Sequence, residues 1–173
     1  MVRAKWLGMI AMTTNLNGIS VTNPSSLYEE DFYLWLKMTA QLLRSRQLDQ
    51  LDFDNLIEEI ESMGSSQRRE IKNRLIVLLM HLLKYQYQPS KRSSSWVNTI
   101  WEQFYQIESL LEDSPSLKPY YLEIFGQCYS KAILAASSET KLPTSVFPVE
   151  SPFSPEEVSQ SNFIFSLINQ EQE

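Results

Sequence analysis

The alternation of apolar and polar positions predicts helices along most of this chain. From Leu75 to Leu83 the sequence reads LIVLLMHLL, which is apolar on nearly every side of a helix, so other helices must surround it. This helix is expected to begin near Ser66 and to end before Pro89, which lacks the amide that a helix needs to continue. A preceding helix, from about Asp54 to Met63, is expected to end at Gly64, which readily adopts the left-handed conformation of a helix C-terminus. The two helices would then fold back on each other at a Gly64-Ser65-Ser66 turn.

Three further long helices follow from spacings of three and four residues between apolar positions, at about 26–47, 96–112 and 119–140. Ser26 and Glu29 form a capping-box pattern at the first of them. The pattern also predicts which side chains face inward: Leu56, Ile60 and Met63 before Gly64; Ile71, Leu75, Leu78 and Leu82 after it; Val97, Ile100, Phe104, Ile107 and Leu111; and Tyr121, Phe125, Cys128, Ala132 and Ala135.

The C-terminal segment is rich in proline from Lys141 onward, and Ser154-Pro155-Glu156-Glu157 is a capping box that predicts a short helix. The expected fold class is therefore all-α, an up-and-down bundle of about five helices with a Pro-rich C-terminal extension. The expected organisation is an N-terminal arm at 1–27, a helical bundle domain at 28–142 and the extension at 143–173.

Charge is segregated along the chain. The 173 residues carry a net charge of −6, which disfavours a general binder of nucleic acid or anionic membranes. Residues 28–63 hold three basic and nine acidic residues, whereas residues 64–92 hold seven basic and one acidic. The reversal falls at Gly64, so the acidic helix is expected to lie along the basic start of the next one.

Single copies of two residue types narrow the possible chemistry. Cys128 is the only cysteine, which excludes an intramolecular disulfide or a thiolate zinc cluster and favours a cytoplasmic location. His81 is the only histidine, so sites that need two imidazoles from one chain are excluded. Arg3 and Lys5 before an apolar stretch resemble a signal peptide, yet no small-residue cleavage site follows, and Met12 is an alternative start to Met1. No apolar run approaches the ~20 residues of a membrane-spanning helix.

A polar stripe on the central helix is the most informative surface feature. At 100° per residue, Arg74, His81, Tyr85 and Gln88 cluster on one side of this helix. The adjoining KYQYQPSKRSSSW segment adds cations and aromatic rings, a composition that suits stacking and phosphate binding but is equally typical of a polar loop over a core. The predicted binding residues are Arg74, His81, Lys84, Tyr85, Gln88, Arg92 and Trp96.

Candidates for catalysis or metal binding are few. His81 is the candidate general base, and Glu58 and Glu61, which share a helix face at a spacing of three, are the candidate metal ligands. If the chain folds back at Gly64, Glu58 is level with about position 70, and His81 lies roughly 16 Å further along its helix. The expectation is therefore a hydrogen-bonded structural histidine, with no metal and no cofactor.

Several long motifs also resemble a known family. LDFDNLIEEIESMG, LLMHLLKYQYQP, SSSWVNTI and LLEDSPSL occur in the order found in the bacterial domain-of-unknown-function family number 29, and the resemblance covers about 27–155. It implies an all-helical fold and no established activity. By position, the characteristic polar residues of the family would be Glu58, Glu59, Glu61, His81, Tyr85, Gln88, Arg92 and Trp96.

Two functions of different classes remain. The preferred hypothesis is a cytoplasmic protein-interaction module without catalysis, a monomer or homodimer that binds an unknown protein partner through the polar stripe and the following loop. An antitoxin-like neutralising protein is a variant of this hypothesis. The alternative is a phosphate-ester hydrolase or nuclease that uses His81 as base and Glu58 or Glu61 to hold a cation.

Overall fold

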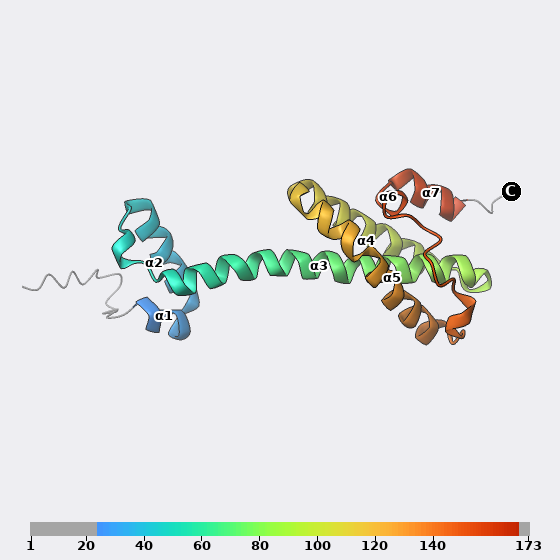
Figure 1. Ribbon diagram of the computed structural model, residues 1–173, viewed down its shortest axis with the longest axis horizontal. Helices are drawn as coiled ribbons and strands as arrows, with labels where there is room; N and C mark the ends of the chain where they lie inside the picture. The colour runs from blue at the N-terminus through green and yellow to red at the C-terminus, as the bar shows by residue number, and fades with distance from the viewer. Residues whose placement is uncertain (1–23, 170–173) are drawn as a thin grey trace, which may run out of the picture. The chain divides into compact units, whose positions relative to one another are not determined.

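A computed structural model describes residues 24–169 (Figure 1), and the predictions that concern residues 1–23 lie outside this range. In the described residues every regular element is helical, which confirms the all-α helical class. The elements in chain order are α1 (Pro24–Glu30), α2 (Phe32–Ser45), η1 (Leu48–Gln50), α3 (Phe53–Tyr87), η2 (Pro89–Lys91), α4 (Ser94–Asp113), η3 (Pro115–Leu117), α5 (Lys118–Thr140), η4 (Thr144–Val146), α6 (Pro155–Val158) and α7 (Ser161–Asn169).

The predicted turn at Gly64 is wrong. Residues 64–66 are helical, and α3 is a single helix of 35 residues from Phe53 to Tyr87. Glycine in a helix interior costs only about 1 kcal/mol relative to alanine, less than the interruption of the hydrogen-bond ladder on both sides of it. A Cβ atom at Gly64 would meet nothing within 4 Å, so no close contact requires a glycine there.

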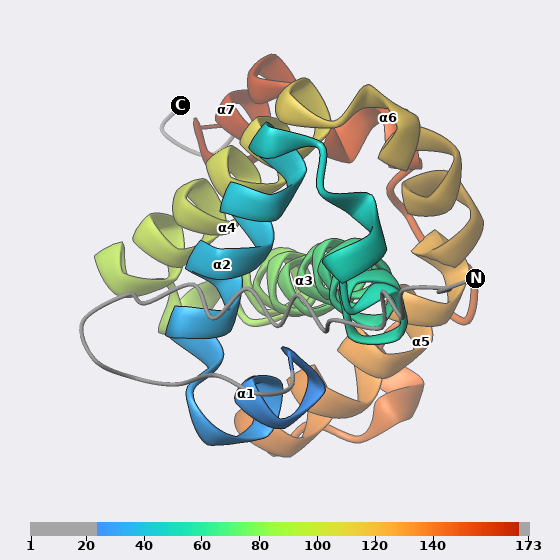
Figure 2. The ribbon, with the colours of Figure 1, turned by 90° about the vertical axis from the view of Figure 1, so that its left-hand side faces the viewer.

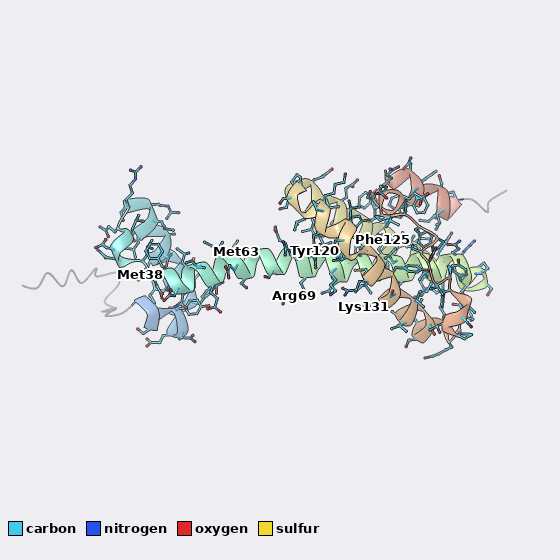
Figure 3. The ribbon with its side chains drawn as sticks, viewed as in Figure 1. Met38, Met63, Arg69, Tyr120, Phe125 and Lys131 are labelled. Carbon is cyan, nitrogen blue, oxygen red and sulfur yellow. The ribbon has the colours of Figure 1, made fainter. Side chains whose placement is uncertain are left out.

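Two predictions depended on that turn and fail with it. Ile60 and Met63 were expected to face inward, but they are 60% and 69% exposed; Met63 is labelled in Figure 3. The acidic residues before Gly64 were expected to pair with the basic residues after it. Arg74 instead forms an ion pair with Glu70, one helical turn away, with Nη2 2.7 Å from Oε1.

The chain divides into two compact units, residues 1–62 and residues 63–173, called unit 1 and unit 2 below. In unit 1 the helix predicted at 26–47 is interrupted at Asp31, whose carboxylate accepts a hydrogen bond from the Leu34 amide and so begins α2. The rings of Tyr28, Phe32 and Trp35 contact one another, with centroids 5.0–5.7 Å apart. The Tyr28 hydroxyl donates to Glu59 of α3 at 2.7 Å.

The core of unit 2 surrounds α3. Figure 2 looks nearly along α3 and shows α4 and α5 on different sides of it. The predicted seam of Ile71, Leu75, Leu78 and Leu82 is fully buried. Of the residues predicted to face inward on α4, Ile100, Phe104 and Ile107 are buried, and Val97 and Leu111 are partly buried against the core. On α5, four of the five predicted residues, Tyr121, Phe125, Cys128 and Ala132, are buried, whereas Ala135 is only partly buried; Phe125 is labelled in Figure 3. Cys128 is a small core residue, as expected.

The Pro-rich segment contributes to this core. The capping box predicted at Ser154 is present, with the Ser154 side chain and Glu157 reciprocally bonded at the start of α6. Phe147, Phe153, Val158 and Ile164 all belong to the buried cluster of unit 2. Hydroxyl groups of α5 hold the segment in place, since Tyr129 donates to the Pro148 carbonyl and Tyr121 to the Pro155 carbonyl. Over the described residues, none of the helices combines the length and the apolar character that crossing a bilayer requires.

Candidate functional site

The end of α3 and the start of α4 bring several predicted binding residues together. Pro89 ends α3, whose last backbone bond runs from the Gln88 amide to the Lys84 carbonyl. After η2, Ser93 caps α4 by accepting a hydrogen bond from the Trp96 amide. We call the resulting cluster of Lys84, Tyr85, Gln88, Arg92 and Trp96 the α3–α4 junction.

Lys84 is buried within this junction, with 5% of its surface exposed. Its ammonium lies 4.5 Å from the centre of the Trp96 ring and 2.5 Å from the Glu139 carboxylate of α5. A buried ammonium is costly unless it is paired, and here a carboxylate and an aromatic face both compensate its charge. Glu139 was not among the predicted site residues, because nothing in its local sequence relates it to a lysine 55 positions earlier.

Arg92 and Tyr85 form the second cation–ring pair. The Arg92 guanidinium lies 4.4 Å from the Tyr85 ring centre, and its Nε donates to the Tyr85 carbonyl at 2.8 Å. The Tyr85 ring is buried, and its hydroxyl donates to the Ile168 carbonyl of α7. Arg92, Gln88 and Trp96 remain partly exposed. The junction therefore presents one guanidinium and one indole whose orientations are set by buried neighbours.

His81 lies one turn before the junction and is half-buried. Its Nδ1 is 2.9 Å from the Val77 carbonyl, so Nδ1 carries the proton of the neutral ring. Burial lowers the pKa of His81, and the Lys84 charge acts in the same direction; the Val77 hydrogen bond and the Glu139 charge partly oppose them. The imidazole is therefore neutral at pH 7, in a hydrogen-bonded position that fits the structural role expected for it.

The lowered pKa of His81 predicts a pH dependence of stability. Because the unfolded chain binds more protons than the folded chain near pH 6, the stabilisation is complete above about pH 6.5 and is lost as the pH falls. We expect the free energy of unfolding in urea to decrease from pH 7.5 to pH 5.5, and the slope to become smaller in His81→Gln. His81 is the only histidine of the chain, so a slope that His81→Gln leaves unchanged would contradict the assignment.

Arg74 lies further along α3, beside an open hollow of about 480 Å³ lined by Ser66, Arg69, Glu70, Asn73, Arg74, Val77 and Gln103. Its guanidinium is held by Glu70 and reaches the Gln103 side chain at 3.5 Å. Its lining residues are polar or charged except for Val77, and two arginines against one glutamate give it a positive balance. Arg74 is therefore a partly exposed cation on the same helix as the junction.

The candidate metal ligands belong to unit 1. Glu58 and Glu61 are exposed on α3, and Glu59 between them accepts the Tyr28 hydrogen bond, which raises the pKa of Tyr28 to about 12. Across residues 24–169, no three histidine, cysteine or acidic side chains are grouped as a metal site would need. The Tyr28–Glu59 contact was not predicted from the sequence, because it depends on how two helices 31 positions apart in the chain pack together.

Fold and site together define a small all-α protein whose polar and aromatic surface is held in place by buried partners. A family model described as "Domain of unknown function DUF29" matches residues 27–164, and the chain belongs to this family. The match confirms the resemblance found in the sequence motifs. No curated protein and no solved structure matches the chain.

Proposed function

We propose that this protein is a cytoplasmic protein-interaction module that binds an acidic segment of a partner protein through Arg74, Gln88, Arg92 and Trp96. The observation that carries the proposal is the paired cation–ring geometry of the α3–α4 junction. Arginine, tryptophan and tyrosine are the residues most enriched among the dominant contacts of protein interfaces. Groups that are already oriented lose less conformational entropy on binding, so they favour affinity.

The basic side chains on and beside the proposed surface support an acidic partner. Residues 64–92 carry seven basic side chains and one acidic side chain, and Arg69, Arg74 and Arg92 all lie on or next to the proposed surface. A surface of one sign steers partners of the opposite sign and discriminates against like charge. The buried members of the predicted set, Lys84 and Tyr85, act in this proposal by holding Trp96 and Arg92.

The test begins with affinity purification of the tagged full-length chain from its native cells and identification of the bound proteins by mass spectrometry. Affinities of a purified partner are then measured by calorimetry for the wild type, Arg92→Ala and Trp96→Ala. We expect each substitution to weaken binding at least about tenfold, which corresponds to 1.4 kcal/mol. The matched control is Lys91→Ala, an exposed cation next to Arg92, for which we expect a change below about twofold.

Thermal melts show whether each variant remains folded. Equal affinities of Arg92→Ala, Trp96→Ala and the wild type would contradict the proposal. If Lys91→Ala weakened binding as much as Arg92→Ala does, the interaction would be a non-specific attraction between charges.

A hydrolase or nuclease remains the second candidate, and the neutral His81 imidazole favours it, because a neutral ring can accept a proton at pH 7. It ranks second because the carboxylate of the nearby Glu139 is paired with Lys84 and does not orient His81. Hydrolysis of bis-p-nitrophenyl phosphate with Mg²⁺ or Mn²⁺ that disappears in His81→Gln would establish the second candidate instead.

A further inference from the structure

Few side chains are buried in the described part of unit 1. Among residues 26–62 only Leu27, Trp35 and Thr39 are buried. The Trp35 indole nitrogen is also buried and has no hydrogen-bond partner among the described residues. Several large apolar side chains of α2 and of the start of α3 are therefore left at the surface of the described residues.

Two exposed apolar stripes, one on α2 and one on α3, offer surface that a partner can bury. On α2, Phe32, Leu36 and Leu43 fall within about 40° of one another around the helix, and they are 42–44% exposed. On α3, Phe53, Ile57 and Ile60 fall within about 60°, and they are 50–60% exposed. At on the order of 100 Å² for each half-exposed large side chain, the six present ~600 Å², close to the ≈800 Å² that one partner buries in a stable interface.

The charges beside the two stripes are opposite in sign. Lys37 and Arg44 flank the α2 stripe, about 100–120° from its centre. Asp54, Glu58 and Glu61 flank the α3 stripe, about 70–130° from its centre and in the same rotational sense. All five side chains are exposed. The α2 stripe with its basic flank is therefore complementary to an α3 stripe with its acidic flank.

We infer that unit 1 is a homodimerisation surface, on which the α2 stripe of one copy packs against the α3 stripe of a second copy. Two-fold symmetry makes this contact twice, so each Lys37–Arg44 flank meets an Asp54–Glu58–Glu61 flank. The surface uses residues different from those of the α3–α4 junction, so it does not rest on the function proposed above. The occupant is a second copy, because a surface that combines both signs in this order matches itself better than it matches a uniformly charged partner.

Charge reversal in the full-length protein tests this inference. We expect the wild type to sediment as a dimer in analytical ultracentrifugation at micromolar concentration. Lys37→Glu/Arg44→Glu places acidic flanks against acidic flanks, and Glu58→Lys/Glu61→Lys places basic flanks against basic flanks. Each double variant should therefore raise the dissociation constant of the dimer at least about tenfold. An equimolar mixture of the two double variants should restore a heterodimer, because both contacts are then complementary.

A second pair of variants tests the apolar part. Ile57→Gln/Ile60→Gln should weaken the dimer, whereas the exposed leucine change Leu134→Gln of α5 should leave it unchanged. Far-UV circular dichroism verifies that each variant retains its helices. A monomeric wild type at 100 µM would overturn the inference, and so would a dimer that the reversals do not weaken or that the mixture does not restore.

Discussion

Ile164→Ala is expected to lower the free energy of unfolding of unit 2 by about 2–5 kcal/mol, whereas Phe165→Ala should change it by less than about 0.5 kcal/mol. The two residues are neighbours on α7, but Ile164 is fully buried and Phe165 is 61% exposed. Truncation of Ile164 removes apolar surface from the core and leaves a cavity, since Ile164 is fully buried in the same cluster as Phe153, Val158 and residues of the core helices. Truncation of Phe165 removes surface that is largely in water already.

Urea unfolding followed by circular dichroism measures both values, and the pair controls for any effect of helix propensity in α7. A loss that is equally small for both variants would show that the C-terminal segment does not contribute to the core in solution. A loss that is equally large would place Phe165 in an interface that covers it.

The central helix of the core was the most predictable part of the chain. The run from Leu75 to Leu83 has too many apolar residues to be stable at a surface, so its burial follows from composition and helical period alone. The ends of helices that carry a side-chain signal were predictable too, as the Ser154 capping box and Pro89 show. These signals were reliable because the same neighbouring residues that form the signal also end or begin the helix in the folded chain.

Gly64 shows why a local signal can mislead. The same residue ends a helix when it adopts positive φ and continues a helix at a cost of about 1 kcal/mol when it does not. Which of the two occurs depends on whether the hydrogen bonds and contacts of a continuous helix stabilise the chain more than those of a turn. That comparison involves distant residues, so the sequence next to Gly64 does not determine it. Asp31 shows the same limit, because the helical period continues through it, whereas its carboxylate caps a new helix, α2.

The candidate site was predictable only where it lies on α3 or in the segment that directly follows it. The shared face of Arg74, His81 and Tyr85 followed from the helical period. Glu139 did not, because its partnership with Lys84 depends on how α5 packs against α3. Lys84 was therefore assigned to the binding surface from its sequence, while its buried ammonium lies against Trp96 and Glu139.

Glu139→Ala is expected to destabilise unit 2 by about 1–3 kcal/mol, because it leaves the Lys84 ammonium buried without its carboxylate. The loss should be smaller than the ~3–5 kcal/mol of a fully buried pair, since half of the Glu139 side chain is exposed and water screens the charge. Lys84→Met keeps the length and apolar stem of the side chain but removes the charge. Replacement of a buried charge by an apolar group is often neutral, so we expect a change below about 1 kcal/mol.

The double variant distinguishes a specific pair from two independent effects. If the Glu139 carboxylate acts through Lys84, then Glu139→Ala should cost little in the Lys84→Met background, and the double variant should be about as stable as Lys84→Met alone. Glu123→Ala, an exposed acid on the same helix α5, is the matched control and should be close to neutral in both backgrounds. The same loss from Glu139→Ala with and without Lys84 would mean that the carboxylate stabilises α5 by another route, and Lys84 would then be free to contact a ligand.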